Sequence, residues 1–217
     1  GCAMSAGTIM VMSGDDILMS DVSALGPIDA QLIQGGKQFS SQAFSDGLNK
    51  IKKEVEDTGV LNKAYIPILQ NISPGEIETA QNVWDFAKNL VAEWLVKYKF
   101  KNWQTHSSTG NPVSAEEKQS AAAKIAEQLR DHGQWKTHGR RIRIADLRNM
   151  GLKITDYSGN PELADAIDRY FILLKMLFDS STHFKVYETP DSQIYRHLPI
   201  PGLPQKNALQ DINTADI

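Results

Sequence analysis

The stretch AMSAGTIMVMSG, residues 3–14, decides how the rest of the chain is interpreted. Small residues surround Ser5, and the apolar side chains that follow predict a tightly packed helix that ends at Gly14. The next segment, residues 15–20, is predicted to turn and to enter a short apolar strand. Gly and Pro within residues 25–29 predict a further turn.

Ser5 is the first candidate for chemistry, because it is predicted to lie where a strand gives way to a helix. Backbone N–H groups at such a junction, including that of Ala6, suit a developing oxyanion. Ser5 is also a good N-cap residue, with small neighbours that allow close packing. The local pattern by itself favours the N-cap interpretation.

Composition limits the class of protein. The chain has 217 residues, a length that fits one domain, or one domain with an appendage. Its net charge of -3 argues against a whole-chain nucleic-acid binder. The single cysteine, Cys2, excludes an intramolecular disulfide and a Cys-rich metal site. No apolar run reaches the length of about 18 residues that a membrane span needs. A soluble, cytoplasmic protein is predicted.

Most of the remaining chain is predicted to be helical. Ser73 with Pro74, and the capping box over residues 114–117, mark two helix starts, and Gly59 marks a helix end. We expect one domain over residues 1–197, helical from about residue 73, and an extended or disordered tail over 198–217. Apolar spacing predicts helices over 44–57, from 74 to about 101, from 115 to about 129 and over 161–178, a short unit over 142–151, and a strand over 184–188.

Three ordered segments of the chain resemble a known family. Residues 3–8 (AMSAGT), 15–19 (DDILM) and 25–31 (LGPIDAQ) resemble the nucleophile region of the serine dehydrogenase proteinase family. These prokaryotic serine peptidases have the ClpP/crotonase fold and are related to signal peptide peptidases of the SppA type. Asp16 stands where the family usually has Glu, and Ala30 where it usually has Pro.

Later parts of the chain add to the resemblance. Residues 137–139 (THG) and 147–152 (LRNMGL) resemble the family's later His-containing segment and its Gly-Leu turn. The resemblance therefore covers roughly residues 2–188. It implies an α/β, ClpP/crotonase-like fold with a helix-rich C-terminal half. Strand-helix repeats and an oxyanion loop precede the nucleophile in that fold, so this chain is expected to be the downstream portion of a longer polypeptide.

The resemblance implies a serine endopeptidase that forms an acyl-enzyme on Ser5, with oxyanion support from the backbone at Ala6. SppA-like relatives use a lysine as base, and Lys50 and Lys53 lie at a spacing from Ser5 comparable to that of single-domain relatives. Both lysines also fit a solvated, charged helix face. ClpP uses Ser, His and Asp instead. Asp29 stands at about the interval of the ClpP histidine, where it orients a base or caps the following turn.

His138 is a further candidate, since it falls in the family's later segment. A histidine beside Gly139 and the following arginines fits equally well as a ligand of backbone carbonyls or of a partner. His132 and His138 lack metal-ligand spacing with Asp131, so no metal site is predicted. Gly35-Gly36 lacks the context of a phosphate-binding loop.

The expected substrate is a peptide or protein, with no cofactor and no nucleic-acid partner. By resemblance the protein forms a homo-oligomer, and relatives are often tethered to a membrane by an N-terminal helix. Two alternatives remain open. The first is a catalytically inactive scaffold or assembly protein of the same fold. The second is a crotonase-type acyl-CoA enzyme, which shares the oxyanion chemistry and needs no serine.

Overall fold

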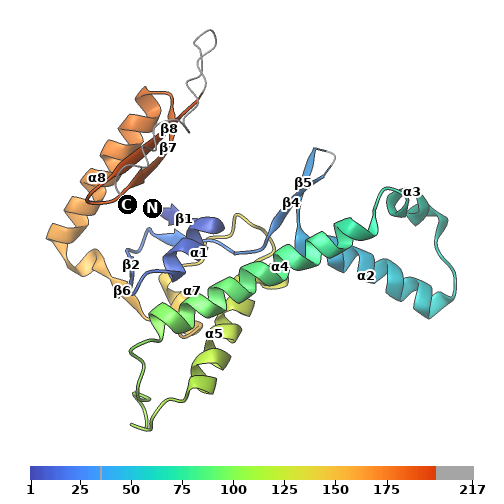
Figure 1. The fold of residues 1–217 in the computed structure, drawn as a ribbon, viewed down its shortest axis with the longest axis horizontal. Helices are drawn as coiled ribbons and strands as arrows, with labels where there is room; N and C mark the ends of the chain where they lie inside the picture. The colour runs from blue at the N-terminus through green and yellow to red at the C-terminus, as the bar shows by residue number, and fades with distance from the viewer. Residues whose placement is uncertain (35, 199–217) are drawn as a thin grey trace, which may run out of the picture. The chain divides into compact units, whose positions relative to one another are not determined.

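The structure is a computed structural model that describes residues 1–34 and 36–198. The chain divides into two compact units, residues 1–159 and 160–217. The fold is of the mixed α/β class, with small sheets among many helices, as the sequence predicts. Figure 1 shows the course of the chain.

Short parallel strands form the centre of the first unit. Strand β1 (Cys2–Ala3) pairs with β3 (Ala24–Leu25), and Ala3 lies opposite Leu25. On its other side, Leu25 forms an antiparallel bridge with Ile142, and each backbone N–H donates to the other residue's carbonyl. Helix α1 (Ala6–Met12) follows β1, and β2 (Ile17–Met19) pairs in parallel with β6 (Ile154–Asp156).

A β-hairpin leads from these strands into the first long helix. Strands β4 (Gln31–Gln34) and β5 (Lys37–Ser40) are antiparallel, with Gln34 opposite Lys37. Helix α2 (Ser41–Thr58) starts with the Ser40 hydroxyl accepting from the N–H of Ala43. It ends at Gly59, whose φ of 70° belongs to the left-handed region that glycine enters without a steric penalty.

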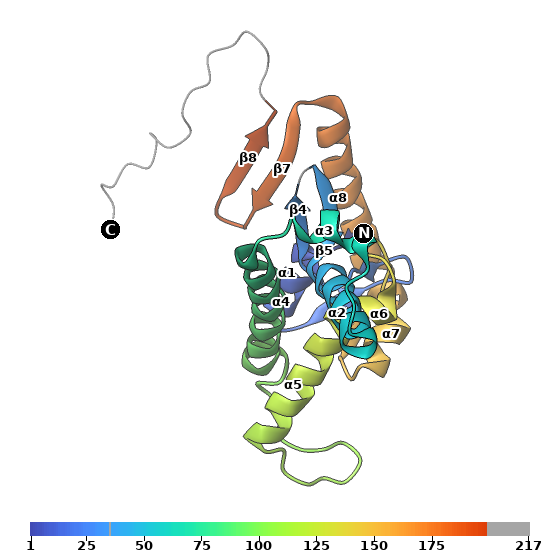
Figure 2. The same ribbon diagram turned by 90° about the vertical axis from the view of Figure 1, so that its right-hand side faces the viewer.

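Two longer helices cover the strands. Helix α4 (Pro74–Trp94) begins with a capping box and passes into the π-helical segment η2 (Leu95–Lys99). Helix α5 (Ala115–Arg130) begins with a second capping box, so both predicted starts are confirmed. α4 packs against α5 and α2 (Figure 1 and Figure 2). The described part of the unit also contains short helical segments: η1 (Lys63–Tyr65), α3 (Ile66–Leu69), α6 (His132–Trp135), α7 (Ile144–Asn149) and, after β6, η3 (Tyr157–Gly159).

The core of this unit lies between the strands and the α4–α5 pair. Its side chains come from α1, β2, β3, α4, η2, α5 and α7, so one apolar cluster fixes both the strands and the helices. The largest side chains buried there are those of Met12, Ile28, Val91, Leu95, Ile125, Leu129, Ile142 and Leu147.

Arg130 ties the end of α5 to α4. Its Nη2 donates to Glu127 Oε2 at 2.8 Å, and its guanidinium lies 4.5 Å from the centre of the Trp84 ring. Nη1 reaches Asp85 Oδ1 at 3.4 Å. Hydrogen bonds from Gln81 and from this guanidinium hold the pKa of Asp85 below its ordinary value. The two carboxylates thus compensate the buried charge of Arg130, and these contacts fix the end of α5 against α4.

The second unit contains one helix and one hairpin. Helix α8 (Pro161–Ser180) packs against β7 (His183–Glu188), which pairs in antiparallel fashion with β8 (Gln193–His197). None of the residues of α8, all of which are described, is buried. The predicted strand over 184–188 is confirmed. Almost all of the predicted tail, residues 199–217, lies outside the described residues.

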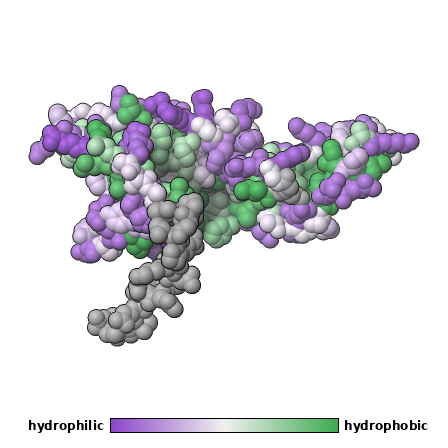
Figure 3. Space-filling model, turned by 90° about the horizontal axis from the view of Figure 1, so that it is seen from above, coloured by the Kyte–Doolittle hydropathy of each residue, from purple (hydrophilic) through white to green (hydrophobic). Residues whose placement is uncertain are grey.

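Exposed apolar side chains also occur around α3. Val60, Ile66 and Ile68 are among them, and Figure 3 shows hydrophobic surface at the right-hand end of the view, where α3 lies.

Within the described ranges, no helix has both the length and the apolar content needed to cross a membrane.

Candidate functional site

Ser5 lies at a sharp turn between β1 and α1. Its backbone has φ 51° and ψ -114°, a conformation that side chains with a Cβ rarely adopt. Ser5 occupies the N-cap position, yet its hydroxyl makes no capping hydrogen bond. The N-cap interpretation therefore does not explain the serine. A strained, half-buried serine between a strand and a helix is similar in local geometry to the serine of a nucleophile elbow.

Neighbouring contacts hold this turn in place. The buried Thr8 hydroxyl lies 2.8 Å from the carbonyls of both Ala3 and Gly26, and it accepts from the Gly26 N–H at 3.0 Å. A Cβ at position 26 would come within 2.9 Å of Met4 Sδ and 3.1 Å of Met4 Cα. The absence of a Cβ at Gly26 therefore allows β3 to approach the turn at Ser5 this closely. Such external support is what allows a strained conformation to persist.

We expect Ser5→Gly to be more stable than Ser5→Ala by about 1 kcal/mol. Both variants lose the hydroxyl, but only glycine adopts positive φ without strain, which is worth about 1–3 kcal/mol before the entropy cost of glycine. Urea unfolding of the two variants measures the difference, with Ser5→Ala as the matched control. Equal unfolding midpoints would show that Ser5 carries no backbone strain.

Asp29 is the centre of a second group of polar side chains. It follows β3 by four residues and is only 1% exposed. Its Oδ1 lies 2.6 Å from His138 Nδ1, and its Oδ2 lies 2.7 Å from Gln31 Nε2. A second imidazole, that of His132, places its Nδ1 3.6 Å from Oδ2. The carboxylate is therefore engaged by side chains from distant parts of the chain.

The partners of Asp29 determine the tautomer of His138. A carboxylate only accepts hydrogen bonds, so the proton of the neutral imidazole is on Nδ1 and the lone pair is on Nε2. Gln31 Nε2 lies 3.3 Å from His138 Nδ1. Both nitrogens are donors, and both donate to the carboxylate of Asp29, so this short separation is not a hydrogen bond between them. Asp29 thus leaves His138 with a basic nitrogen that is directed away from the carboxylate.

Strand pairing brings Ser5, Asp29 and His138 to the same end of the strands. β1 and β3 run in parallel, so Ser5 and Asp29 both follow the carboxyl ends of neighbouring strands. Leu25 and Ile142 are antiparallel, so the residues before Ile142 lie beside those after Leu25. The described residues show no hydrogen bond between Ser5 Oγ and His138.

The two candidate lysines lie elsewhere in the first unit. Lys50 and Lys53 are exposed on α2, and Figure 1 shows α2 leading away from α1 and β1. The side chain of Lys99 differs from theirs, because burial lowers its pKa. Its Nζ donates to the carbonyl of Gly14, beyond the end of α1 that is opposite to Ser5. The structure therefore brings none of these three lysines to Ser5.

Ala6, the predicted oxyanion residue, is the first residue of α1 and is exposed. Its N–H donates to no other described residue. Sequence reasoning missed two members of the Asp29 group, Gln31 and His132. The only signal for Gln31 is its place two residues after Asp29 in the segment LGPIDAQ, and His132 has none beyond its proximity to His138 in the sequence.

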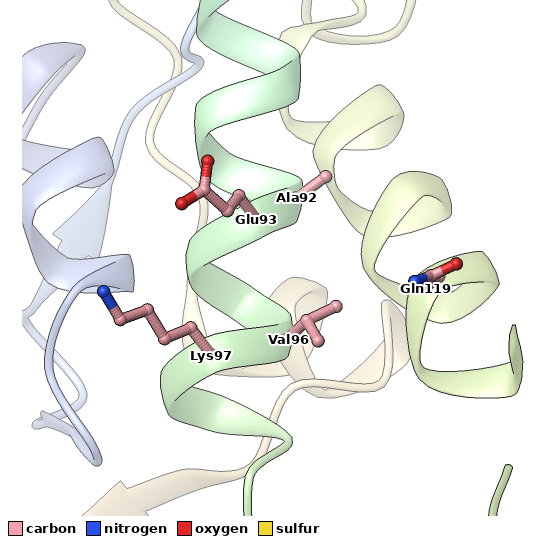
Figure 4. A pocket seen from close by; sticks show the side chains of 5 residues that line it. All are labelled: Ala92, Glu93, Val96, Lys97 and Gln119. Carbon is pink, nitrogen blue, oxygen red and sulfur yellow. The ribbon is translucent and has the colours of Figure 1, made fainter. Parts of the chain in front are cut away.

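A shallow pocket lies between α4 and α5, apart from these residues. It is lined by Ala92, Glu93, Val96, Lys97 and Gln119. Figure 4 shows Ala92 and Val96 on the side of the helix that faces α5, and Glu93 and Lys97 on another side. Its polar groups do not converge on one point, so the pocket offers no constellation for catalysis. Within the part of the chain that is described, no group of His, Cys, Asp and Glu side chains fits a metal ion.

Comparisons of the chain with protein-family models, with curated proteins and with solved structures found no match. The assignment of a function therefore depends on the geometry of Ser5, Asp29 and His138.

Proposed function

We propose that this protein is a serine hydrolase that cleaves peptide bonds through an acyl-enzyme on Ser5. The observation that carries the proposal is the strained backbone of Ser5 together with a hydroxyl that makes no capping hydrogen bond. A structural serine in a turn gains nothing from positive φ, whereas a nucleophile gains an exposed position at the end of a strand. The resemblance to ClpP/crotonase-fold serine peptidases supports the same assignment.

In this proposal His138 is the general base and Asp29 orients it. His138 Nε2 takes the proton of Ser5 Oγ as that oxygen bonds to the carbonyl carbon of the scissile peptide. The imidazolium, stabilised by Asp29, then gives this proton to the departing amine as the C–N bond breaks. Water hydrolyses the acyl-enzyme by the same steps, with His138 again acting as base. The N–H of Ala6 supports the oxyanion.

The contacts of His138 favour it over Lys50 and Lys53 as the base. A lysine accepts a proton near neutral pH only when burial or neighbouring cations destabilise its charged form. Both lysines are exposed on α2. His138, by contrast, has its Nδ1 proton held by a buried carboxylate, which is the state that a general base requires.

The two alternatives make different demands on Ser5. An inactive scaffold has no use for a strained serine with an unpaired hydroxyl. A crotonase-type acyl-CoA enzyme needs backbone oxyanion donors but no nucleophile. The strained turn therefore favours covalent catalysis over both. A peptide substrate is favoured over other acyl compounds by the family resemblance alone.

A fluorophosphonate probe tests the nucleophile directly. We expect intact-mass spectrometry to show one probe adduct on the folded protein, and none on Ser5→Ala. Ser13→Ala is the matched control, because Ser13 lies at the other end of α1 with an ordinary φ of -78°. A wild-type protein that is folded and remains unlabelled would contradict the proposal and favour the scaffold. Binding of an acyl-CoA without labelling would favour the crotonase-type enzyme.

A further inference from the structure

Gln31 joins the β-hairpin to the buried carboxylate. It is the first residue of β4, and it lies opposite Ser40 in the hairpin. The N–H of Ser41 donates to the carbonyl of Ala30 at 2.8 Å, which fixes the backbone beside it. The half-buried side chain of Gln31 then reaches Asp29 Oδ2 with its Nε2. The hairpin therefore fixes the backbone of Gln31, and the side-chain amide of Gln31 donates to Asp29.

Two imidazoles face the single carboxylate of Asp29. His138 Nδ1 is at hydrogen-bond distance from Oδ1, 2.6 Å, and His132 Nδ1 is beyond it at 3.6 Å from Oδ2. The backbone of His132 is fixed, because its main-chain N–H donates to Gln42 Oε1 of α2 at 2.8 Å. Both histidines are equally exposed, with side chains 29% accessible. Exposure therefore does not decide which imidazole Asp29 binds.

We propose that Gln31 is a positioning residue that holds Asp29 Oδ2 and thereby directs the carboxylate to His138 rather than to His132. Gln31 supplies the donor that Oδ2 needs, so a carboxylate rotation toward His132 would break two short hydrogen bonds to form one. Without the amide, a buried oxygen is left unpaired, which is costly. His132 Nδ1 is the nearest donor that can then take its place. The titratable groups in this contact network are Asp29, His132 and His138.

The consequence for catalysis rests on the proposed function. Loss of the Gln31 amide lets the carboxylate of Asp29 rotate until Oδ2 binds His132 Nδ1, and this rotation moves Oδ1 away from His138 Nδ1. His138 then has a weaker contact with the partner that fixes its tautomer. Substrate binding does not involve this contact. We therefore expect Gln31→Leu to lower kcat by about 10- to 100-fold, the range of a hydrogen bond to a charged group, with KM changed less than about 2-fold.

Three variants test the inference in the full chain. Gln31→Leu removes the amide, and Gln38→Leu removes an exposed amide from the other strand of the same hairpin as the matched control. The double variant Gln31→Leu with His132→Asn also removes the competing imidazole, and it is expected to regain at least half of the lost activity on a logarithmic scale. Equal losses in Gln31→Leu and Gln38→Leu would overturn the proposal, as would a double variant no better than Gln31→Leu.

A measurement without substrate separates this inference from the proposed function. The ¹⁵N chemical shifts of labelled histidine report which ring nitrogen carries the proton, with His138→Asn used for assignment. We expect the Nδ1–H form of His138 to dominate in the wild type and in Gln38→Leu, and to decline in Gln31→Leu. An unchanged His138 tautomer in Gln31→Leu would refute the positioning role. A changed tautomer in a protein that no probe labels would keep the positioning role and refute the hydrolase.

Discussion

Asp29→Asn is expected to lower kcat by about 10⁴-fold while the protein remains folded, as in enzymes that use a carboxylate to orient a catalytic histidine. Gln31 determines how the new side-chain amide at position 29 is oriented. Its Nε2 donates to Oδ2 of Asp29, so it would keep the oxygen of the new amide on its own side and turn the amide NH₂ toward His138. His138 Nδ1 would then have to accept, which moves its proton to Nε2. An imidazole protonated on Nε2 cannot take the proton of Ser5.

Hydrolysis rates of a peptide or activated ester substrate measure this loss. Asp131→Asn is the matched control, since Asp131 lies next to His132 but uses its carboxylate to accept from the N–H of Gln134. The control is expected to stay within about 3-fold of the wild type, because an asparagine caps a helix as well as an aspartate does. A loss below 10-fold in Asp29→Asn would show that the carboxylate does not serve the reaction.

Ile142→Ala is expected to destabilise the protein by about 2–5 kcal/mol, the usual range for removing a large aliphatic side chain from a core. The Ile142 side chain is fully buried in the cluster with Leu129 and Leu147. Its backbone bridges Leu25, so this residue also anchors the segment that carries His138. Urea unfolding followed by tryptophan fluorescence measures the free energy of unfolding.

Ile33→Ala provides the comparison for Ile142→Ala. Ile33 lies in β4 and is 78% exposed, so the same deletion there is expected to change the free energy of unfolding by less than about 0.5 kcal/mol. Similar effects of the two substitutions would mean that the antiparallel bridge at Leu25 is not part of the stable core.

The helices were predictable because their signals are local. The Ser73 and Ser114 capping boxes each use side chains three residues apart, and Gly59 ends α2 by its own backbone preference. The half-buried stripe of Phe44 and Leu48 follows from helical spacing alone. These features depend on neighbours in the sequence, so they can be identified without knowledge of the rest of the fold.

Short strands were harder to predict. The hairpin of β4 and β5 was missed, although Gly35-Gly36 between two short segments is a hairpin signal. The turn predicted over residues 25–29 includes Leu25, the second residue of β3, because Gly26 and Pro27 follow it. β8 was also missed. A strand of two to five residues has too few positions to show alternation, and its partner in the sheet decides whether it forms.

The candidate site was only partly predictable for a similar reason. Ser5 was a candidate from its local pattern and from the resemblance, and Asp29 and His138 were candidates from the resemblance. The pairing of Asp29 with His138, however, joins residues 109 positions apart. Spacing along the chain also suggested Lys50 and Lys53, which the fold places on an exposed helix face. Distances that depend on tertiary structure cannot be obtained from sequence intervals in a single chain.

The separation of Asp29 and His138 along the sequence also determines when each residue is synthesised. Ribosomes add about 5–20 residues per second, so His138 is synthesised about 5–20 s after Asp29. During this interval the nascent chain already contains Ser5 but has no imidazole on the Asp29 carboxylate. Under the proposed function, Ser5 therefore gains its base only when the last part of the first unit has been made.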